Sequence, residues 1–399
     1  MRGKRCGRLG GGLALAVIAL TGTSRATAQG PAPAVRSPEV HADRTVTFRL
    51  RAPQADRVDL VGEVLQGKGP QAMTRGADGV WGLTIGPLPP EIWIYNFRVH
   101  GVTVADPANI SVMPRAAGDA HSSFVEIPGD APAYYDARPV PHGEVRMVLY
   151  ESTAMGVHRY LWVYTPPNYD RSNARYPVFY LLHGNGETQS GWVANGRANI
   201  ILDNLIADGK AEPMIVVMPH GHPIQSASVG PFALVPPVGQ PGMLNFTLFT
   251  RDLLDQVIPF VDRNYRVDTD ADRRAIGGLS MGGFQSIEIG LAHPELFRSV
   301  LAYSGGFGGL GPTASAVNIE TQSPWKERLA NPGAAKNLRL LFLGSGQQET
   351  GMLAPGQRLV GLLQAQGVNA RWSDSPGGHV FSVWRNLLHE SVPLLFKRR

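Results

Sequence analysis

From residue 143 onward, short and almost continuous apolar runs alternate with stretches of helical spacing. The clearest apolar runs are 176–182 and 214–218, and such runs are expected of strands buried on both faces of a parallel sheet. Helical spacing over 198–209 and 249–265 supplies elements to cover those faces. Residues 143–399 are therefore predicted to form an α/β domain with a doubly wound, mostly parallel sheet. Further strands are expected at 145–150, 160–164, 274–279, 300–303 and 338–343, and further helices at 283–292, 357–366 and 381–396.

The preceding residues 38–127 follow a different pattern, in which apolar and polar residues alternate over short segments. Val46, Phe48 and Leu50 show this period of two, which is typical of a strand with one buried face. Strands are also expected around 58–60, 80–85 and 92–99. The pattern predicts a small all-β sandwich, in which Trp81 and Trp93 are expected to be core residues rather than sugar-stacking ones.

Two stretches rich in proline and small residues lie before the sandwich and between the two predicted domains. Residues 29–37 are expected to be a flexible lead-in, and residues 128–142 are expected to link the sandwich to the α/β domain. A third such stretch, 223–245, is poor in charge and is predicted to border the acyl pocket, as a lid.

The first 28 residues have the pattern of a secretory signal peptide. A basic start is followed by the apolar run 13–20 and by Ala26-Thr27-Ala28, which predicts cleavage before Gln29. The alternative is a membrane anchor, but a spanning helix needs about 20 apolar residues. A secreted or periplasmic location is expected, with no membrane attachment after cleavage.

Removal of that leader changes the charge of the chain. The leader contains five of the 37 basic residues and none of the 32 acidic ones, so the remaining chain is formally neutral. No nucleic-acid partner is therefore expected. The one cysteine, Cys6, also lies in the leader, which excludes disulfides, thiol nucleophiles and thiolate metal sites from the mature chain.

Gly278-Leu279-Ser280-Met281-Gly282 lies between a predicted strand and a predicted helix. This arrangement is typical of a nucleophile elbow, a sharp turn that lifts a serine above the sheet edge at a helix N-terminus. Ser280 is therefore the candidate nucleophile. A glycine-rich turn with a capping serine is the alternative.

A serine nucleophile needs a base and an acid that orients it. His379 follows Gly377-Gly378 downstream of Ser280, which is the position of the base in the order serine, acid, histidine. Glu349 follows the strand at 338–343 and is the candidate acid. Asp374, on or beside the strand before His379, remains the rival candidate.

The oxyanion of the tetrahedral intermediate needs two backbone N–H donors. Met281 is expected to supply one, and the loop His183-Gly184-Asn185-Gly186-Glu187 the other, with Asn185 preferred and Gly186 second. His183 is expected to brace this loop. His220 and His222 resemble a metal pair, but they have no carboxylate at ligand spacing, and no metal site is expected.

The segment Tyr95–Gly101, with Asp106-Pro107-Ala108-Asn109, resembles the early-set immunoglobulin-type module of starch-branching and debranching enzymes. The same module precedes some bacterial esterases. The resemblance implies an immunoglobulin-like sandwich over residues 38–127 that is able to bind polysaccharide.

Residues 143–399 resemble the esterase-D-like group of α/β-hydrolases, which includes feruloyl and acetylxylan esterases, enterochelin esterases and mycolyltransferases. The match rests on the segments 180–187, 203–206, 214–219, 273–283 and 377–385, with Trp192, Asn199, His293-Pro294, Phe297 and Ser304-Gly305. The resemblance implies an acyl-enzyme mechanism without a cofactor and substrate contacts from Gly186 and Trp192. Glu349 departs from the family, whose acid is usually aspartate.

Three functions follow as hypotheses. The first is a secreted serine esterase of feruloyl or acetylxylan type, with acylated polysaccharide or its oligosaccharides as partner. The second is an enterochelin-type siderophore esterase. The third is a carbohydrate-binding protein with an inactive hydrolase domain, which the complete set Ser280, Glu349 and His379 disfavours.

Overall fold

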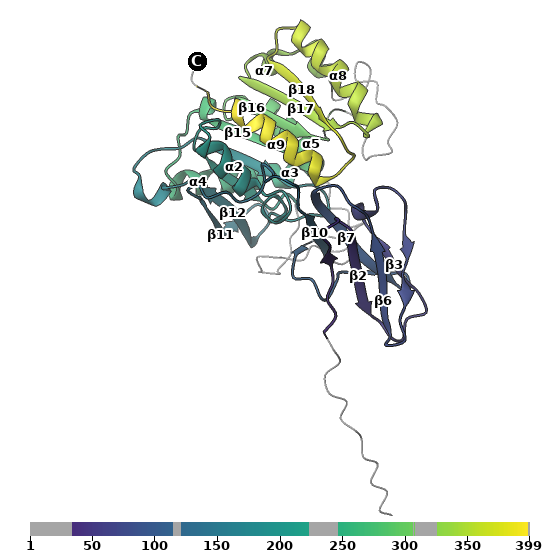
Figure 1. Ribbon diagram of the computed structural model, residues 1–399. Coiled ribbons are helices and arrows are strands. Elements are labelled where there is room, and N and C mark those ends of the chain that lie inside the picture. The colour runs from purple at the N-terminus through teal and green to yellow at the C-terminus, as the bar shows by residue number, and fades with distance from the viewer. Residues whose placement is uncertain (1–33, 115–120, 223–245, 306, 308–324, 398–399) are drawn as a thin grey trace, which may run out of the picture. The chain divides into compact units, whose positions relative to one another are not determined.

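An eight-stranded sheet is the centre of the C-terminal part of the chain (Figure 1). The computed structural model describes residues 34–114, 121–222, 246–305, 307 and 325–397. The strand order is β11-β12-β14-β13-β15-β16-β17-β18, with β12 antiparallel to both of its neighbours and the other pairs parallel. The predicted mostly parallel sheet is confirmed. The strands are β11 (Glu144–Ser152), β12 (Val157–Thr165), β13 (Val178–Leu182), β14 (Ile215–Pro219), β15 (Arg274–Leu279), β16 (Ser299–Tyr303), β17 (Leu340–Gly346) and β18 (Ala370–Ser375).

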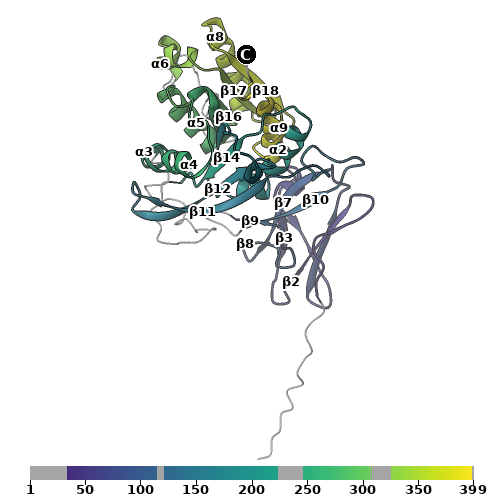
Figure 2. The ribbon, with the colours of Figure 1, turned by 90° about the vertical axis from the view of Figure 1, so that its left-hand side faces the viewer.

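Helices cover both faces of this sheet, as the two sides of Figure 2 show. Successive strand residues alternate between two cores: Val178, Tyr180 and Leu182 face one, and Phe179 and Leu181 face the other. The first core is closed by α3 (Phe246–Asp252), the π-helical turn η3 (Leu253–Val257), α4 (Ile258–Asn264), α5 (Met281–Ala292) and α8 (Thr350–Ala365). The second is closed by α1 (Gly191–Ala194), α2 (Ala198–Ala207) and α9 (Phe381–Ser391). Shorter helices are α6 (Trp325–Ala330), α7 (Gly333–Lys336), η2 (Tyr169–Arg171), η4 (Ala271–Arg273) and η5 (Val392–Leu394).

Three helices differ from their predicted form. The helix predicted over 381–396 ends as α9 at Ser391 and is followed by the short helix η5. The stretch predicted as one helix over 249–265 contains the π-helical turn η3 between α3 and α4. Helix α8 begins at Thr350, seven residues before the predicted start. Gly351, Pro355 and Gly356 have poor helix propensity, but the apolar side of α8 is buried against the sheet, and that burial outweighs propensity.

The N-terminal region is a two-sheet antiparallel sandwich, which confirms the predicted all-β region. One sheet has the order β1-β2-β6-β5, and the other has β4-β3-β7-β10-β9, with β8 paired to β7. Trp81 lies in the core between the sheets, as predicted, and Trp93 packs half-buried against that core. The strands are β1 (Glu39–Val40), β2 (Val46–Arg51), β3 (Val58–Val61), β4 (Gln71–Ala72), β5 (Thr74–Arg75), β6 (Val80–Ile85), β7 (Glu91–Val99), β8 (Val102–Val104), β9 (Val112–Met113) and β10 (Ser122–Ile127), with the short helix η1 (Glu63–Leu65).

The motif that resembles the early-set module has a structural role in this sandwich. The Asp106 carboxylate accepts hydrogen bonds from the Tyr95 hydroxyl at 2.7 Å and from the Ser37 hydroxyl at 2.6 Å. Asn109 donates to the Tyr95 oxygen at 3.0 Å. Because Tyr95 and Asp106 are buried, these contacts hold the loop after β8 against β7.

The segment 128–142 joins β10 to β11 and is packed against the α/β domain. The Asn204 side chain on α2 donates to the backbone oxygens of Tyr134 and Asp136, each at 2.9 Å. The Tyr134 hydroxyl donates to the Asn386 side chain on α9. Tyr135 belongs to the same apolar cluster as α2 and α9. The proline-rich composition marked the connection but did not reveal this packing.

Some of the predicted features lie outside the described residues. These are the signal peptide, most of the lead-in and the stretch 223–245. Among the residues that the structure does describe, none of the helices is both long enough and apolar enough to span a bilayer.

Candidate active site

The nucleophile elbow forms where β15 ends and α5 begins. Ser280 has φ 51° and ψ −113°, a conformation that a non-glycine residue rarely adopts. A Cβ atom on Gly278 would lie 2.5 Å from the Leu182 backbone oxygen, and one on Gly282 would lie 2.6 Å from the same atom. Both glycines are therefore required, because the turn packs directly on the end of β13. The strain is held by a 2.7 Å hydrogen bond from the Ser280 N–H to the Tyr303 oxygen.

The structure brings Ser280, His379 and Glu349 into one hydrogen-bonded relay. His379 Nε2 lies 2.9 Å from Ser280 Oγ, and His379 Nδ1 lies 2.6 Å from Glu349 Oε1. With Nδ1 bonded to a carboxylate, its proton is held there and Nε2 is left to accept a proton from the serine. This is the geometry that a serine nucleophile and its general base require.

Glu349 is buried and remains ionised. Burial alone raises the pKa of its carboxyl, but hydrogen bonds from His379, Ser304 and the Gly346 amide outweigh burial, and the net pKa is lowered. The Ser304 hydroxyl donates to Oε2 at 2.6 Å, and the Gly346 N–H donates to the same oxygen at 2.7 Å. A buried carboxylate with these donors is a fixed negative charge beside the imidazole.

Asp374, the rival acid, has other partners. Its two oxygens accept from Trp372 Nε1 at 3.1 Å and from Gln347 Nε2 at 2.9 Å. Glu349 rather than Asp374 therefore orients His379.

Ser304 and Trp384 support the relay, and their roles were missed from the sequence. The Trp384 indole donates to Ser304 Oγ at 3.0 Å, and its ring meets the His379 ring edge-on with centroids 4.9 Å apart. Ser304, which follows β16, has φ 53°. A serine with left-handed backbone has no sequence signal of its own, although it lies within the segments that carry the family resemblance.

The predicted oxyanion loop, residues 183–187, is held by two histidines. His183 Nδ1 donates to the Gly184 oxygen at 2.8 Å, and its Nε2 accepts from the Gly221 N–H at 2.8 Å. The Gly186 N–H donates to His222 Nε2 at 3.3 Å. That contact occupies the Gly186 amide, which favours Asn185 as the donor from this loop. Met281, the other predicted donor, is the first residue of α5, where backbone N–H groups have no partner within the helix.

His183, His220 and His222 are buried together and neutral. Burial lowers the pKa of His183 to about 4 and that of His222 to about 3, and it holds the pKa of His220 well below its ordinary value. The positive charge of Arg159 lowers all three further. His183 and His222 brace the loop through their hydrogen bonds. Within the part of the chain that the structure describes, no group of three His, Cys, Asp or Glu side chains is arranged to hold a metal ion.

A cavity of about 160 Å³ opens beside Ser280 and His379. Asn185, Glu187 and Phe381 are among the residues that line it, and Glu63 and Ile94 line it from the β-sandwich. The expected substrate contact of Trp192 is wrong, because its side chain is fully buried and donates to the Leu182 oxygen at 2.9 Å. Gly186 is likewise absent from the residues lining this cavity.

The chain belongs to the Esterase family, which matches residues 152–395. An endo-1,4-beta-xylanase/feruloyl esterase of Xylanibacter ruminicola is 32% identical over 92% of this chain and 46% of its own length. The iron(III) enterobactin esterase of Escherichia coli K12 is 25% identical over 72% of this chain and 66% of its own. The chain spans about half the length of the curated relatives it matches.

Solved structures share the fold. The enterobactin esterase of Shigella flexneri superposes with a TM-score of 0.64 at 22% identity, covering 88% of this chain and 92% of that one. A ferulic acid esterase of the anaerobic fungus Anaeromyces mucronatus has a TM-score of 0.51 at 20% identity, covering 67% of this chain and 96% of its own. The alignment with the first structure extends beyond the α/β domain, because that domain makes up less than 88% of the chain.

Proposed function

We propose that this protein is a serine esterase that hydrolyses carboxylic esters through an acyl-enzyme on Ser280. The observation that carries the proposal is the relay from Glu349 through His379 to Ser280 at a strained elbow beside a cavity. Family membership supports the same chemistry.

The reaction has two halves. Ser280 Oγ attacks the ester carbonyl carbon while His379 Nε2 takes the serine proton, and Glu349 stabilises the imidazolium that forms. The backbone N–H groups of Met281 and Asn185 stabilise the oxyanion. The bond to the alcohol then breaks as His379 returns the proton to the leaving oxygen. In the second half, water activated by His379 attacks the acyl carbon, and the bond to Ser280 Oγ breaks to release the acid.

The proposed substrate is an acylated plant polysaccharide or one of its oligosaccharides, with a feruloyl or acetyl group. The relative named xylanase/feruloyl esterase, aligned over 92% of this chain, supports this choice. Hydrolysis of a siderophore trilactone is the second candidate, supported by the fold shared with enterobactin esterases. The leader-like N-terminus supports action outside the cytoplasm.

The test compares the wild-type protein with Ser280→Ala on p-nitrophenyl acetate. Ser280→Ala should reduce kcat by about 10⁴-fold or more, because the nucleophile is lost. Equal background rates for both proteins would overturn the esterase proposal in favour of a carbohydrate-binding protein with an inactive hydrolase domain. Methyl ferulate, acetylated xylan and enterobactin then separate the two candidate substrates.

A further inference from the structure

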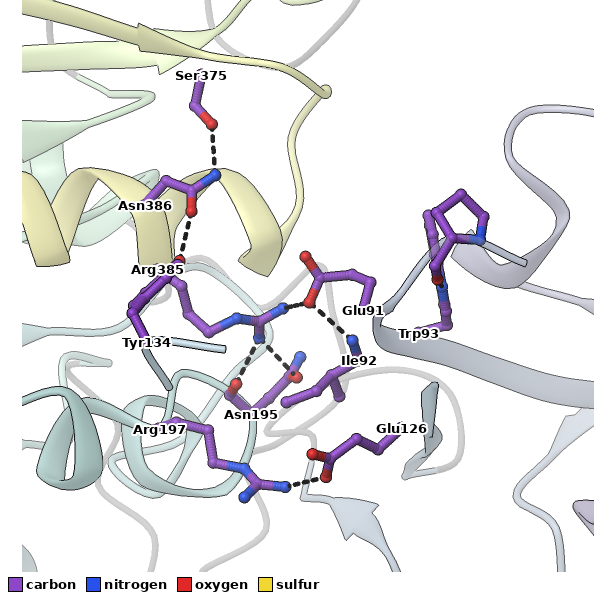
Figure 3. Close-up of polar contacts among 11 residues, drawn as sticks. Glu91, Ile92, Trp93, Glu126, Tyr134, Asn195, Arg197, Ser375, Arg385 and Asn386 are labelled. Atoms are coloured by element: carbon purple, nitrogen blue, oxygen red, sulfur yellow. Dashed lines mark hydrogen bonds and ion pairs between the residues drawn. The ribbon is translucent and has the colours of Figure 1, made fainter. Parts of the chain in front are cut away.

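Arg385 carries a positive charge that is fully buried in the first half of helix α9. Its guanidinium donates to the Asn195 backbone oxygen at 2.6 Å and to the Asn195 side-chain oxygen at 3.3 Å (Figure 3). It also lies over the Tyr135 ring, 5.0 Å from the centroid. These neutral partners satisfy N–H donors but leave the charge itself unbalanced.

The counter-charge comes from the β-sandwich. Glu91, the first residue of β7, forms an ion pair with Arg385, and its carboxylate also accepts from the Ile92 N–H at 2.7 Å. Glu91 and Arg385 are 294 residues apart in the chain. A buried guanidinium without a carboxylate partner is strongly destabilising, so the position of α9 depends on a residue of the other domain.

The start of α9 is where the catalytic base is held. His379 lies two residues before the first residue of this helix. Trp384, the neighbour of Arg385, contacts the His379 ring and donates to Ser304 Oγ, which in turn donates to Glu349. A shift of this turn of α9 therefore displaces the supports of both the base and the acid. Relays of this kind lose rate with displacements of about 1 Å.

The same region of the sandwich also reaches the cavity. Ile94, three residues after Glu91 on β7, lines the cavity together with Glu63 of η1. A Cβ atom on Gly62 would lie 2.6 Å from the Ile94 oxygen, so η1 is packed closely on this part of β7. The strand that supplies the counter-charge thus also supplies part of the wall beside Ser280.

We propose that Glu91 is a positioning residue for His379, acting through Arg385, and that the β-sandwich is thereby a structural part of the active site. This inference rests on the proposed esterase function. The Glu91 carboxylate of the β-sandwich neutralises the buried guanidinium of Arg385. Arg385 in turn anchors helix α9, at whose start the α/β domain holds His379.

Glu126 and Arg197 provide a matched control. This pair also joins the sandwich, at β10, to the α/β domain, with a contact of 2.8 Å (Figure 3). Its side chains remain 42% and 22% exposed, against 17% and 0% for Glu91 and Arg385. Both pairs cross the same boundary, but the Glu126 pair is partly exposed and does not involve α9.

The experiment measures kcat of the full-length wild-type, Glu91→Gln and Glu126→Gln proteins on p-nitrophenyl acetate. Each rate is divided by the concentration of active sites titrated with diethyl p-nitrophenyl phosphate, so that unfolded protein does not count. Glu91→Gln should lower kcat per site about tenfold, because the base is displaced. Glu126→Gln should stay within about twofold of wild type.

A double-mutant cycle tests whether Glu91 acts on His379 through Arg385. In an Arg385→Met background, Glu91→Gln should have no further effect on kcat per site, because there is no buried charge left to balance. An unchanged kcat per site for Glu91→Gln, or an equal loss in both backgrounds, would overturn the inference. An inactive wild-type enzyme would overturn the esterase proposal as well, which distinguishes the two failures.

A second variant, Glu91→Asp, keeps the inference testable if Glu91→Gln does not fold. If Glu91→Gln yields no folded protein, Glu91→Asp takes its place, because it keeps the charge but draws it back by one methylene. Its kcat per site should fall about threefold, since the contact to Arg385 is lengthened. A wild-type kcat per site for Glu91→Asp would contradict the inference.

Discussion

Two buried arginines flank the active site, and they differ in where their counter-charge comes from. Arg159 on β12 donates to the backbone oxygens of His220 and His222 and pairs with Asp252 at 2.9 Å, all within the α/β domain. Arg385 on α9 supports the side that carries the base and pairs with Glu91 of the β-sandwich. One side of the site is thus complete within its own domain, and the other is not.

The two sides also differ in how they respond to protons. Beside the oxyanion loop lie three neutral histidines, of which His183 and His222 must stay unprotonated at Nε2 to accept their hydrogen bonds from backbone N–H groups. The base side depends on Glu349, whose pKa is lowered, and on the Glu91–Arg385 ion pair. Acid should therefore weaken the oxyanion side, whereas loss of the sandwich contact should weaken the base side.

The largest effect is expected for Glu349, the acidic residue that orients the catalytic base His379. Glu349→Gln should lower kcat on p-nitrophenyl acetate about 10⁴-fold, because a neutral amide neither fixes the tautomer of His379 nor stabilises its protonated form. Asp374→Asn is the control and should retain activity, since Asp374 bonds Trp372 and Gln347 instead. A comparable loss in Asp374→Asn would break the assignment of Glu349.

The next effect concerns the stability of the two-domain unit. Glu91→Gln should lower the free energy of unfolding by about 3–5 kcal/mol, because the guanidinium of Arg385 is left buried without its counter-charge. Glu126→Gln should lower it by less than about 1 kcal/mol, since that pair is partly exposed. Urea denaturation followed by tryptophan fluorescence measures both. An equal loss of unfolding free energy in both variants would show that the buried and the partly exposed ion pair do not differ in their contribution to stability.

Lowering the pH should destabilise the oxyanion side of the site. The pKa of His183 is about 4 and that of His222 about 3 in the folded protein, against an ordinary value of 6.5. Below pH 6.5 the unfolded chain therefore binds more protons, and stability should fall as the pH decreases toward 4. Each such histidine contributes at most about 1.4 kcal/mol per pH unit to that loss.

The measurement for this prediction is the free energy of unfolding at several pH values between 7 and 4. His222→Gln should make its dependence on pH shallower, because one buried neutral histidine is removed. Identical slopes in wild type and His222→Gln would contradict a neutral histidine brace.

The smallest effect is expected at the cavity wall that the sandwich supplies. Ile94→Ala should change the ratio of kcat/KM between methyl ferulate and p-nitrophenyl acetate by about three- to tenfold, because apolar wall contacts discriminate only modestly between substrates. Val102→Ser, on the exposed surface of the same sandwich, should leave the ratio unchanged. A wild-type ratio in Ile94→Ala would confine the sandwich to a supporting role.

Much of the catalytic side follows from local patterns. The strand at 274–279 is found at the predicted residues, and the elbow forms at the predicted turn. These features are local: a continuous apolar run demands burial on both faces, and two flanking glycines permit the close approach to β13. The order of Ser280, Glu349 and His379 along the chain also reflects the order of parallel strands, each of which ends at the same edge of the sheet.

The errors at the site have a common cause. Trp192 lies close to the oxyanion loop in sequence, but burial against the second core turns its indole away from the cavity. No sequence pattern indicates the role of Ser304, because its contact with Glu349 spans 45 residues. Sequence proximity and composition do not show which way a side chain points once two layers pack together.

Short-range periodicity and strand order were enough to predict the two kinds of domain, the doubly wound sheet and the residues that meet at its edge. The pairing of Glu349 rather than Asp374 with His379, and of Glu91 with Arg385, became visible only in the packed molecule. A buried charge must find its partner wherever packing brings one, and here packing brings it from a different domain.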